Sequence, residues 1–126
     1  MRDPVVIDGS CVLHNGQRIR IWGIDTPEAS QAEGLSAKDH LVQLCQRRHI
    51  HVVPRGKDAN GQMVAYLFCG RGDIGAAMVA GGYAVSANGA YVRLEMSSRR
   101  NRMGLWRDGW IENPTIHRLA KKKRLT

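Results

Sequence analysis

The chain has 126 residues, a length typical of one domain, and its 43% apolar and 24% charged residues are typical of a globular protein. No apolar run approaches the ~18 residues of a membrane span, which excludes a membrane-spanning helix. Nineteen Lys and Arg against 11 Asp and Glu give a net charge of +8. This balance favours polyanionic partners: nucleic acid, anionic lipid or acidic polysaccharide.

The start of the chain predicts a tight antiparallel meander. Strands are expected at residues 5–7, 11–13 and 18–24, because each run is apolar and each is followed by a turn signal. Asn15-Gly16 between the second and third runs is a strong hairpin signal. No signal peptide is visible after Met1, which leaves a cytoplasmic protein and an exported protein with its leader removed as alternatives.

The next segment changes to a helical period. Ser36 is expected to cap a helix in which Ala37, Leu41, Leu44 and Cys45 form one apolar face. Further strands are predicted at residues 50–54 and 63–69, with a turn at residues 58–61 between them.

The rest of the chain predicts two more helices. Asp73 is expected to cap a helix that runs to Ala80, and residues 91–103 form the third. Leu105 and Trp106 are expected to fold back onto the core. Five strands with three helices predict an α+β protein built on a five-stranded OB-fold β-barrel. We expect one domain over residues 1–110, a basic tail over residues 111–126, and a monomer.

The three cysteines have no spacing suited to zinc. Cys11, Cys45 and Cys69 lie in apolar segments, so we expect free buried thiols. A Cys11–Cys69 disulfide is the alternative for an exported protein.

Two carboxylates bracket a rigid turn at Asp25-Thr26-Pro27-Glu28. Arg20 precedes Asp25 by five residues, a spacing that strand alternation would place on opposite faces. A break in the strand would let them converge, and Gly23 is the expected place for it. The alternative without chemistry is a salt-bridged strand end, in which Arg20 pairs with Asp25 or Glu28.

Five sequence blocks in order resemble the staphylococcal nuclease (thermonuclease) family. They are D-G-x-x-V (8–12), R-I-R-I-W-G-I-D-T-P-E (18–28), D-x-N-G-x-x-V-A-Y (58–66), D-I-G-A-A-M-V-A-G-G-Y-A (73–84) and Y-V-R-L-E…N-R-M-G-L-W (91–106). The likeness covers roughly residues 5–106. It extends to short bacterial homologues labelled succinoglycan biosynthesis proteins.

The resemblance implies an OB barrel that binds one Ca²⁺ and cleaves phosphodiesters in DNA and RNA. It assigns Asp25 and the backbone carbonyl of Thr26 to the metal, both being the oxygen ligands that a hard cation prefers. Glu28 would orient or deprotonate the attacking water, and Arg20 would grip the phosphate.

The chain departs from the family pattern at four positions, one of which is Cys11 in place of the usual Thr. Ser10 stands where the family has its first metal-binding Asp, which removes one ligand charge. Gln62 stands where the family has its second arginine, and glutamine cannot neutralise a phosphate. Asn60 replaces an aromatic residue that would stack on the nucleotide. Arg55, Lys57 and Arg71 are expected to be solvated surface charges rather than substitutes for the missing arginine.

These departures leave three hypotheses open. The first is a metal-dependent endonuclease or phosphodiesterase that uses Arg20, Asp25 and Glu28. The second, which the substitutions favour, is a module with a degenerate site that binds single-stranded DNA or RNA and cuts weakly or not at all. In it, Ca²⁺ or another divalent cation is weakly bound or absent. The third is an interaction domain whose basic surface docks another anionic partner.

Overall fold

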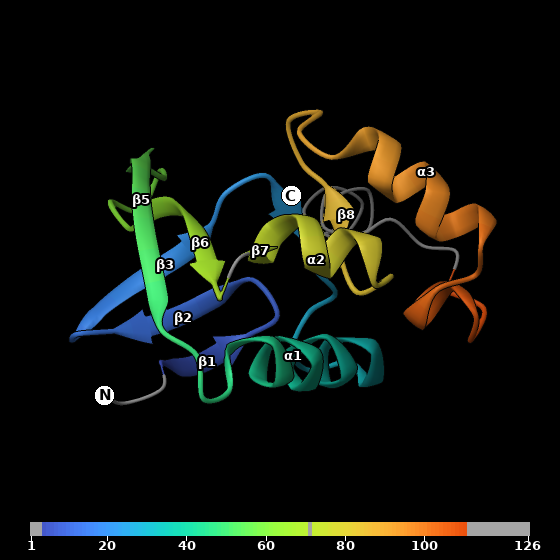
Figure 1. Ribbon diagram of the computed structural model, residues 1–126, viewed down its shortest axis with the longest axis horizontal. Coiled ribbons are helices and arrows are strands. Elements are labelled where there is room, and N and C mark those ends of the chain that lie inside the picture. The colour runs from blue at the N-terminus through green and yellow to red at the C-terminus, as the bar shows by residue number, and fades with distance from the viewer. Residues whose placement is uncertain (1–3, 71, 111–126) are drawn as a thin grey trace, which may run out of the picture.

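The computed structural model describes residues 4–70 and 72–110, and the predicted basic tail at residues 111–126 lies outside this range. The α+β class is confirmed, with strands β1, β2, β3, β5 and β6 gathered on one side and β8, α2 and α3 toward the other (Figure 1). The elements, in chain order, are β1 (Val5–Asp8), β2 (Cys11–His14), β3 (Gln17–Ile21), β4 (Ile24–Asp25), α1 (Ala32–Cys45), β5 (Ile50–Lys57), β6 (Met63–Cys69), β7 (Gly72–Asp73), α2 (Ile74–Ala80), β8 (Val85–Ser86), α3 (Val92–Arg100) and the 3₁₀ turn η1 (Gly104–Trp106).

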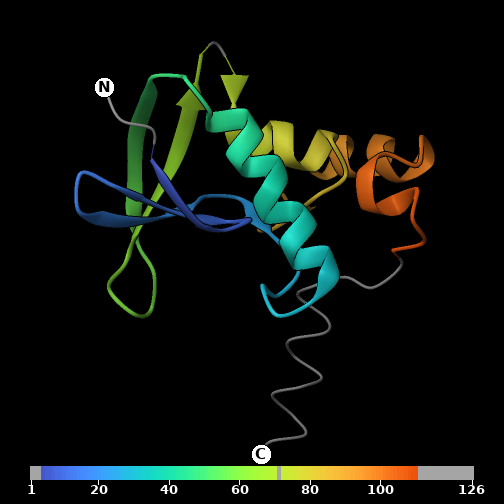
Figure 2. The ribbon, with the colours of Figure 1, turned by 90° about the horizontal axis from the view of Figure 1, so that it is seen from below.

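The main sheet is mixed and follows the order β1-β2-β3-β6-β5, with β7 paired to β6. Each pair is antiparallel except β3 and β6, which run parallel. Among the described strands, no pairing joins β1 to β5, so closure into the expected barrel is not observed. Helix α1 lies across the sheet beside β1 (Figure 2).

The prediction of a single strand over residues 18–24 is wrong, because the structure has two strands in this segment, β3 and β4. Gly23 has φ of +83°, a left-handed conformation that favours glycine, and it separates β3 from β4. Strand β4 then leaves the main sheet and pairs with β8, so that Asp25 lies opposite Val85. The break therefore lies at the residue where the sequence predicted it. It redirects the chain just before the turn at residues 25–28, which we call the carboxylate turn.

The first helix begins at Ala32 rather than after Ser36. Gln31 occupies the N-cap position in an extended conformation, and its side chain makes no capping hydrogen bond. The predicted apolar face is confirmed, since Ala37, Leu41 and Cys45 are buried. Helix α1 thus starts four residues after Glu28, directly after the carboxylate turn.

The second half of the chain largely follows the prediction. The Asp73 side chain accepts a hydrogen bond from the Ala76 amide at 3.3 Å and caps α2. Helix α3 is shorter than the predicted 91–103, because it ends at Arg100. Leu105 and Trp106 are buried, as expected.

The core lies between the inner face of the sheet and the helices. Strand alternation directs Ile19 and Ile21 of β3 and Ala65 and Leu67 of β6 into it. No helix in the described part of the chain has the length and apolarity to cross a bilayer.

All three cysteines are buried thiols, which confirms the thiol interpretation. The two sulfur atoms that approach each other are those of Cys45 and Cys69, at 3.5 Å. Cys11 instead lies against Gln62, so the alternative Cys11–Cys69 bridge does not form in this structure.

His40 of α1 provides a test of how α1 packs against the end of α2. Its ring stacks on Tyr83 with centroids 4.2 Å apart, and burial lowers the pKa of the imidazole from its ordinary value of 6.5. The unfolded chain therefore binds a proton more readily than the folded one, and stability is lost as pH falls below about 6.5.

We expect the free energy of unfolding from urea titrations to fall less between pH 7.5 and pH 5 in H40Q than in the parent. The exposed His51 supplies the control, because H51Q should keep the parental slope. Equal slopes for H40Q and the parent would contradict the prediction.

Candidate nucleic-acid site

The carboxylate turn is held inside the protein. Asp25 is 5% exposed and Thr26 1% exposed, and the Thr26 amide donates to Asp25 Oδ1 at 3.0 Å. Glu28 is half-buried, and its carbonyl accepts the Gln31 amide at 3.0 Å as the chain enters α1. The backbone that carries both carboxylates is therefore a turn that is continuous with a helix.

Two glycines let neighbouring segments close on this turn. A Cβ on Gly34 of α1 would overlap the Glu28 carbonyl. A Cβ on Gly9, in the turn between β1 and β2, would lie 2.8 Å from Ala37 Cβ and 3.2 Å from Thr26 Cγ2. Because glycine at positions 9 and 34 has no side chain, the β1–β2 turn, the carboxylate turn and α1 can pack closely together.

Ser10 sits on the β1–β2 turn next to this contact, and its side chain is engaged within the turn. Asp8 Oδ1 accepts from the Ser10 amide at 2.8 Å and from the Ser10 hydroxyl at 3.0 Å. The Ser10 carbonyl accepts the Ile21 amide at 2.8 Å. The turn is therefore tied to β3 by its backbone and stabilised internally by Asp8.

Arg20 lies on β3 between the strands that carry the other candidate positions. It is opposite Cys11 on β2 and in register with Val64 on β6. Its neighbours Ile19 and Ile21 are buried, so alternation places Arg20 on the face away from the core. Convergence of its guanidinium group with Asp25 and Glu28 remains a prediction.

Gln62 is brought to the same region by a tight turn. Asp58 Oδ1 accepts the amides of Asn60 and Gln62, both at 2.9 Å, and Gln62 Nε2 reaches Cys11 Sγ at 3.0 Å. Burial and the nearby Asp8 charge raise the pKa of the Cys11 thiol. Gln62 and Arg18 line a hollow of about 530 Å³ beside this contact.

No calcium site of the kind that the sequence resemblance implies is evident among the described residues. Within residues 4–70 and 72–110, no group of three or more His, Cys, Asp or Glu side chains could together hold a metal ion. Ser10 offers a neutral hydroxyl that already donates to Asp8. Calcium affinity depends on the charge of its ligands, and Ser10 supplies one ligand charge fewer than the Asp of the family pattern.

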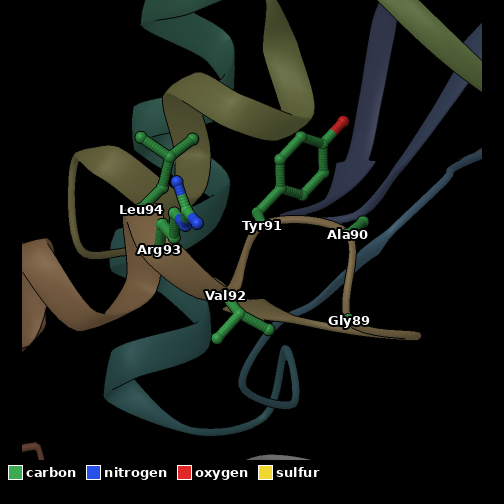
Figure 3. A pocket seen from close by; sticks show the side chains of 6 residues that line it. All are labelled: Gly89, Ala90, Tyr91, Val92, Arg93 and Leu94. Carbon is green, nitrogen blue, oxygen red and sulfur yellow. The ribbon is translucent and has the colours of Figure 1, made fainter.

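Tyr91 is a structural residue near the site that the sequence did not single out. Its hydroxyl donates to Asp73 Oδ2 at 2.7 Å, and burial together with Asp73 raises its pKa. Its ring edge lies 2.9 Å from where a Cβ on Gly23 would be, so it packs on the break between β3 and β4. Figure 3 shows this ring at the start of α3, beside a hollow of about 390 Å³ lined by residues 89–94.

Comparison with known proteins identifies the family. The model of the staphylococcal nuclease homologue family matches residues 18–108. The chain belongs to the staphylococcal nuclease family. The match includes Arg20, the carboxylate turn and Gln62, whereas Ser10 lies before its start.

The relatives within this family include whole nucleases and larger proteins. Micrococcal nuclease of Shigella flexneri is 30% identical over 93% of this chain and 79% of its own length. The probable staphylococcal-like nuclease CAN4 of Oryza sativa is 29% identical over 91% of this chain but only 24% of its own length. Staphylococcal-like nuclease CAN1 of Arabidopsis thaliana is 28% identical, and the chain spans 36% of it. The chain therefore spans about a quarter to a third of these plant proteins.

The contact between Gly34 and Glu28 predicts that alanine at position 34 destabilises the protein. Gly→Ala inside a helix ordinarily stabilises by about 0.5–1 kcal/mol, but forcing a methyl group into closely packed atoms costs about 1–3 kcal/mol. We expect G34A to lower Tm by about 5 °C in thermal unfolding. Gly72 has no atom within 4 Å of its would-be Cβ, so G72A should change Tm by no more than about 2 °C. A G34A protein as stable as the parent would show that α1 does not press on the carboxylate turn.

Proposed function

We propose that this chain binds single-stranded nucleic acid at a nuclease-type site and hydrolyses phosphodiester bonds weakly or not at all. Membership of a nuclease family implies nucleic acid as the ligand. The net charge of +8 suits a phosphate backbone, which supplies strongly salt-dependent affinity. The sheet order β1-β2-β3-β6-β5 is consistent with the OB fold of the family, which we take as the scaffold.

One observation carries the proposal: both substituted side chains are turned toward protein partners. Ser10 donates to Asp8, and Gln62 donates to Cys11. In the family pattern these two positions would supply a metal-binding carboxylate and a phosphate-binding arginine. Loss of an arginine that stabilises a transferring phosphoryl group commonly costs ~10³-fold or more in rate.

The residues that remain still suit phosphate binding. Arg20 would hold the phosphate of the strand by paired N–H donors. Asp25, the Thr26 carbonyl and Glu28 are the remaining family positions on the carboxylate turn. Glu28 would accept the proton of an attacking water in any residual hydrolysis.

An active metal-dependent endonuclease is the second candidate. It is favoured by the retention of Arg20 on β3 and of Asp25 and Glu28 on the carboxylate turn, where Asp25 is buried. The relatives described as nucleases point the same way.

The two candidate functions predict different binding and cleavage of single-stranded DNA by the parent protein and by the variants E28Q and R20Q. We expect gel-shift binding that weakens steeply with salt, and little cutting in Ca²⁺, Mg²⁺ or Mn²⁺. E28Q should remove whatever cutting remains and keep binding, because Glu28 acts only on the water. R20Q should weaken binding and lower the salt slope by about 0.7, the contribution of one phosphate contact.

Arg107 supplies a matched control, since it is exposed and lies outside the site in an ion pair with Asp108 at 3.5 Å. R107Q should bind and cut as the parent does. Rapid cutting by the parent that disappears in E28Q would establish the endonuclease instead. No binding at low salt would eliminate both candidates.

A further inference from the structure

A cluster of aromatic rings lies on the outer face of the sheet, capped by an arginine. The rings of Trp22 and Tyr66 have centroids 4.8 Å apart, and Phe68 follows at 6.2 Å from Tyr66. The guanidinium carbon of Arg55 lies 4.8 Å from the centroid of the Trp22 ring and 5.5 Å from that of Tyr66. We call Trp22, Arg55, Tyr66 and Phe68 the outer aromatic patch.

The backbone directs these side chains away from the core. Ala65 and Leu67 of β6 are buried, so Tyr66 and Phe68 leave the opposite face of the strand. The register of β5 against β6 shifts between Pro54 and Gly56, which makes Arg55 the extra residue. Such irregularities re-aim a side chain, and here the guanidinium group lies over the rings.

The outer aromatic patch shares its face with the candidate site. Arg20 is in register with Val64, and the Trp22 amide continues the parallel ladder by donating to the Ala65 carbonyl at 2.8 Å. Trp22 and Tyr66 are therefore two residues beyond Arg20 and Val64 on neighbouring strands, about 7 Å along the sheet. A strand with one phosphate at Arg20 can reach the patch with an adjacent nucleotide.

The chemistry of the patch matches single-stranded nucleic acid. Trp22, Tyr66 and Phe68 are half-buried and outside the fully buried core, whereas Arg55 is exposed. A base can stack on an aromatic ring or on a guanidinium plane, and the guanidinium edge can bind a phosphate. The nearest carboxylate on β7, that of Asp73, already accepts from Tyr91 and Ala76.

We propose that the outer aromatic patch binds the bases next to the phosphate held at Arg20 in single-stranded nucleic acid. The inference rests on the proposed function, because it extends the same strand along the sheet. It supplies a stacking surface in a chain that has Asn60 where the family pattern has an aromatic residue. Arg55 is then part of the binding surface rather than a solvated charge.

The test compares a long and a short ligand. Thymidine 3′,5′-bisphosphate carries one nucleoside and reports on the Arg20 site, whereas a 12-nucleotide oligothymidylate also covers the patch. W22L should lower affinity for the 12-mer by about 5- to 150-fold, the effect of losing the stacking of one base. R55Q should lower it by about 2- to 5-fold and reduce the salt slope by about 0.7. Neither variant should change affinity for the bisphosphate.

Two controls separate stacking from charge and from folding. R107Q removes an exposed arginine elsewhere and should bind the 12-mer as the parent does. A duplex of equal length has its bases stacked internally, so W22L should bind it as the parent does. Arg55 is exposed, so R55Q decides the test on its own if W22L does not fold.

The outcomes distinguish this inference from the proposed function. A parent that binds the 12-mer, with W22L and R55Q binding it equally well, overturns the inference and leaves the proposed function standing. Equal losses on single strand and duplex overturn it as well, since the contact would then be only electrostatic. If W22L loses self-association in sedimentation instead of DNA affinity, the patch is an interface between copies. A parent that binds no DNA at low salt overturns both proposals.

Discussion

The fit of two glycine residues against the carboxylate turn is the constraint on which the rest of the site depends. Gly9 lets the β1–β2 turn approach Thr26 and Ala37, and Gly34 lets α1 approach the Glu28 carbonyl. Any side chain at either position would push its segment away from the turn, because close-packed interiors tolerate little added volume. The arrangement of the turn thus depends on backbone contacts rather than on the side chains that would do chemistry.

The backbone arrangement of the site therefore does not depend on the side chains at positions 10 and 62. The carboxylate turn, the β1–β2 turn and β3 are joined by backbone hydrogen bonds and glycine contacts that Ser10 and Gln62 leave intact. The two substituted side chains form local hydrogen bonds instead, with Asp8 and Cys11. The same sheet also carries the surface that we propose for base stacking, because Trp22 and Tyr66 lie beyond Arg20 on its outer face.

The sequence predicted those features that are carried by local signals. The Asp73 cap, the apolar face of α1 and the break at Gly23 all follow from residue type and spacing. The sequence places the start of α1 too late, because Ser36 has the residue type of a cap, whereas the helix begins at Ala32 with no side-chain hydrogen bond at the N-cap Gln31. The two-residue strand β8 was missed because its pairing with β4 is a tertiary contact. The stacking of Arg55 on Trp22 likewise joins residues from separate strands. Candidate site positions could be named from the family blocks, whereas the partners of Ser10 and Gln62 needed coordinates.

The central claim is that the backbone of a nuclease site is kept while two of its working side chains have been replaced. The double variant S10D/Q62R tests it most directly, by metal-dependent cleavage of single-stranded DNA measured beside the parent, each single variant and S10D/Q62R/E28Q. The account predicts a rise of at least ~10²-fold in the double variant, since one restored charge-stabilising group is worth about that much, and loss of the gain in the triple variant. No rise in a double variant with the parental circular dichroism spectrum and Tm would contradict it, because the backbone would then no longer hold the geometry of the family site.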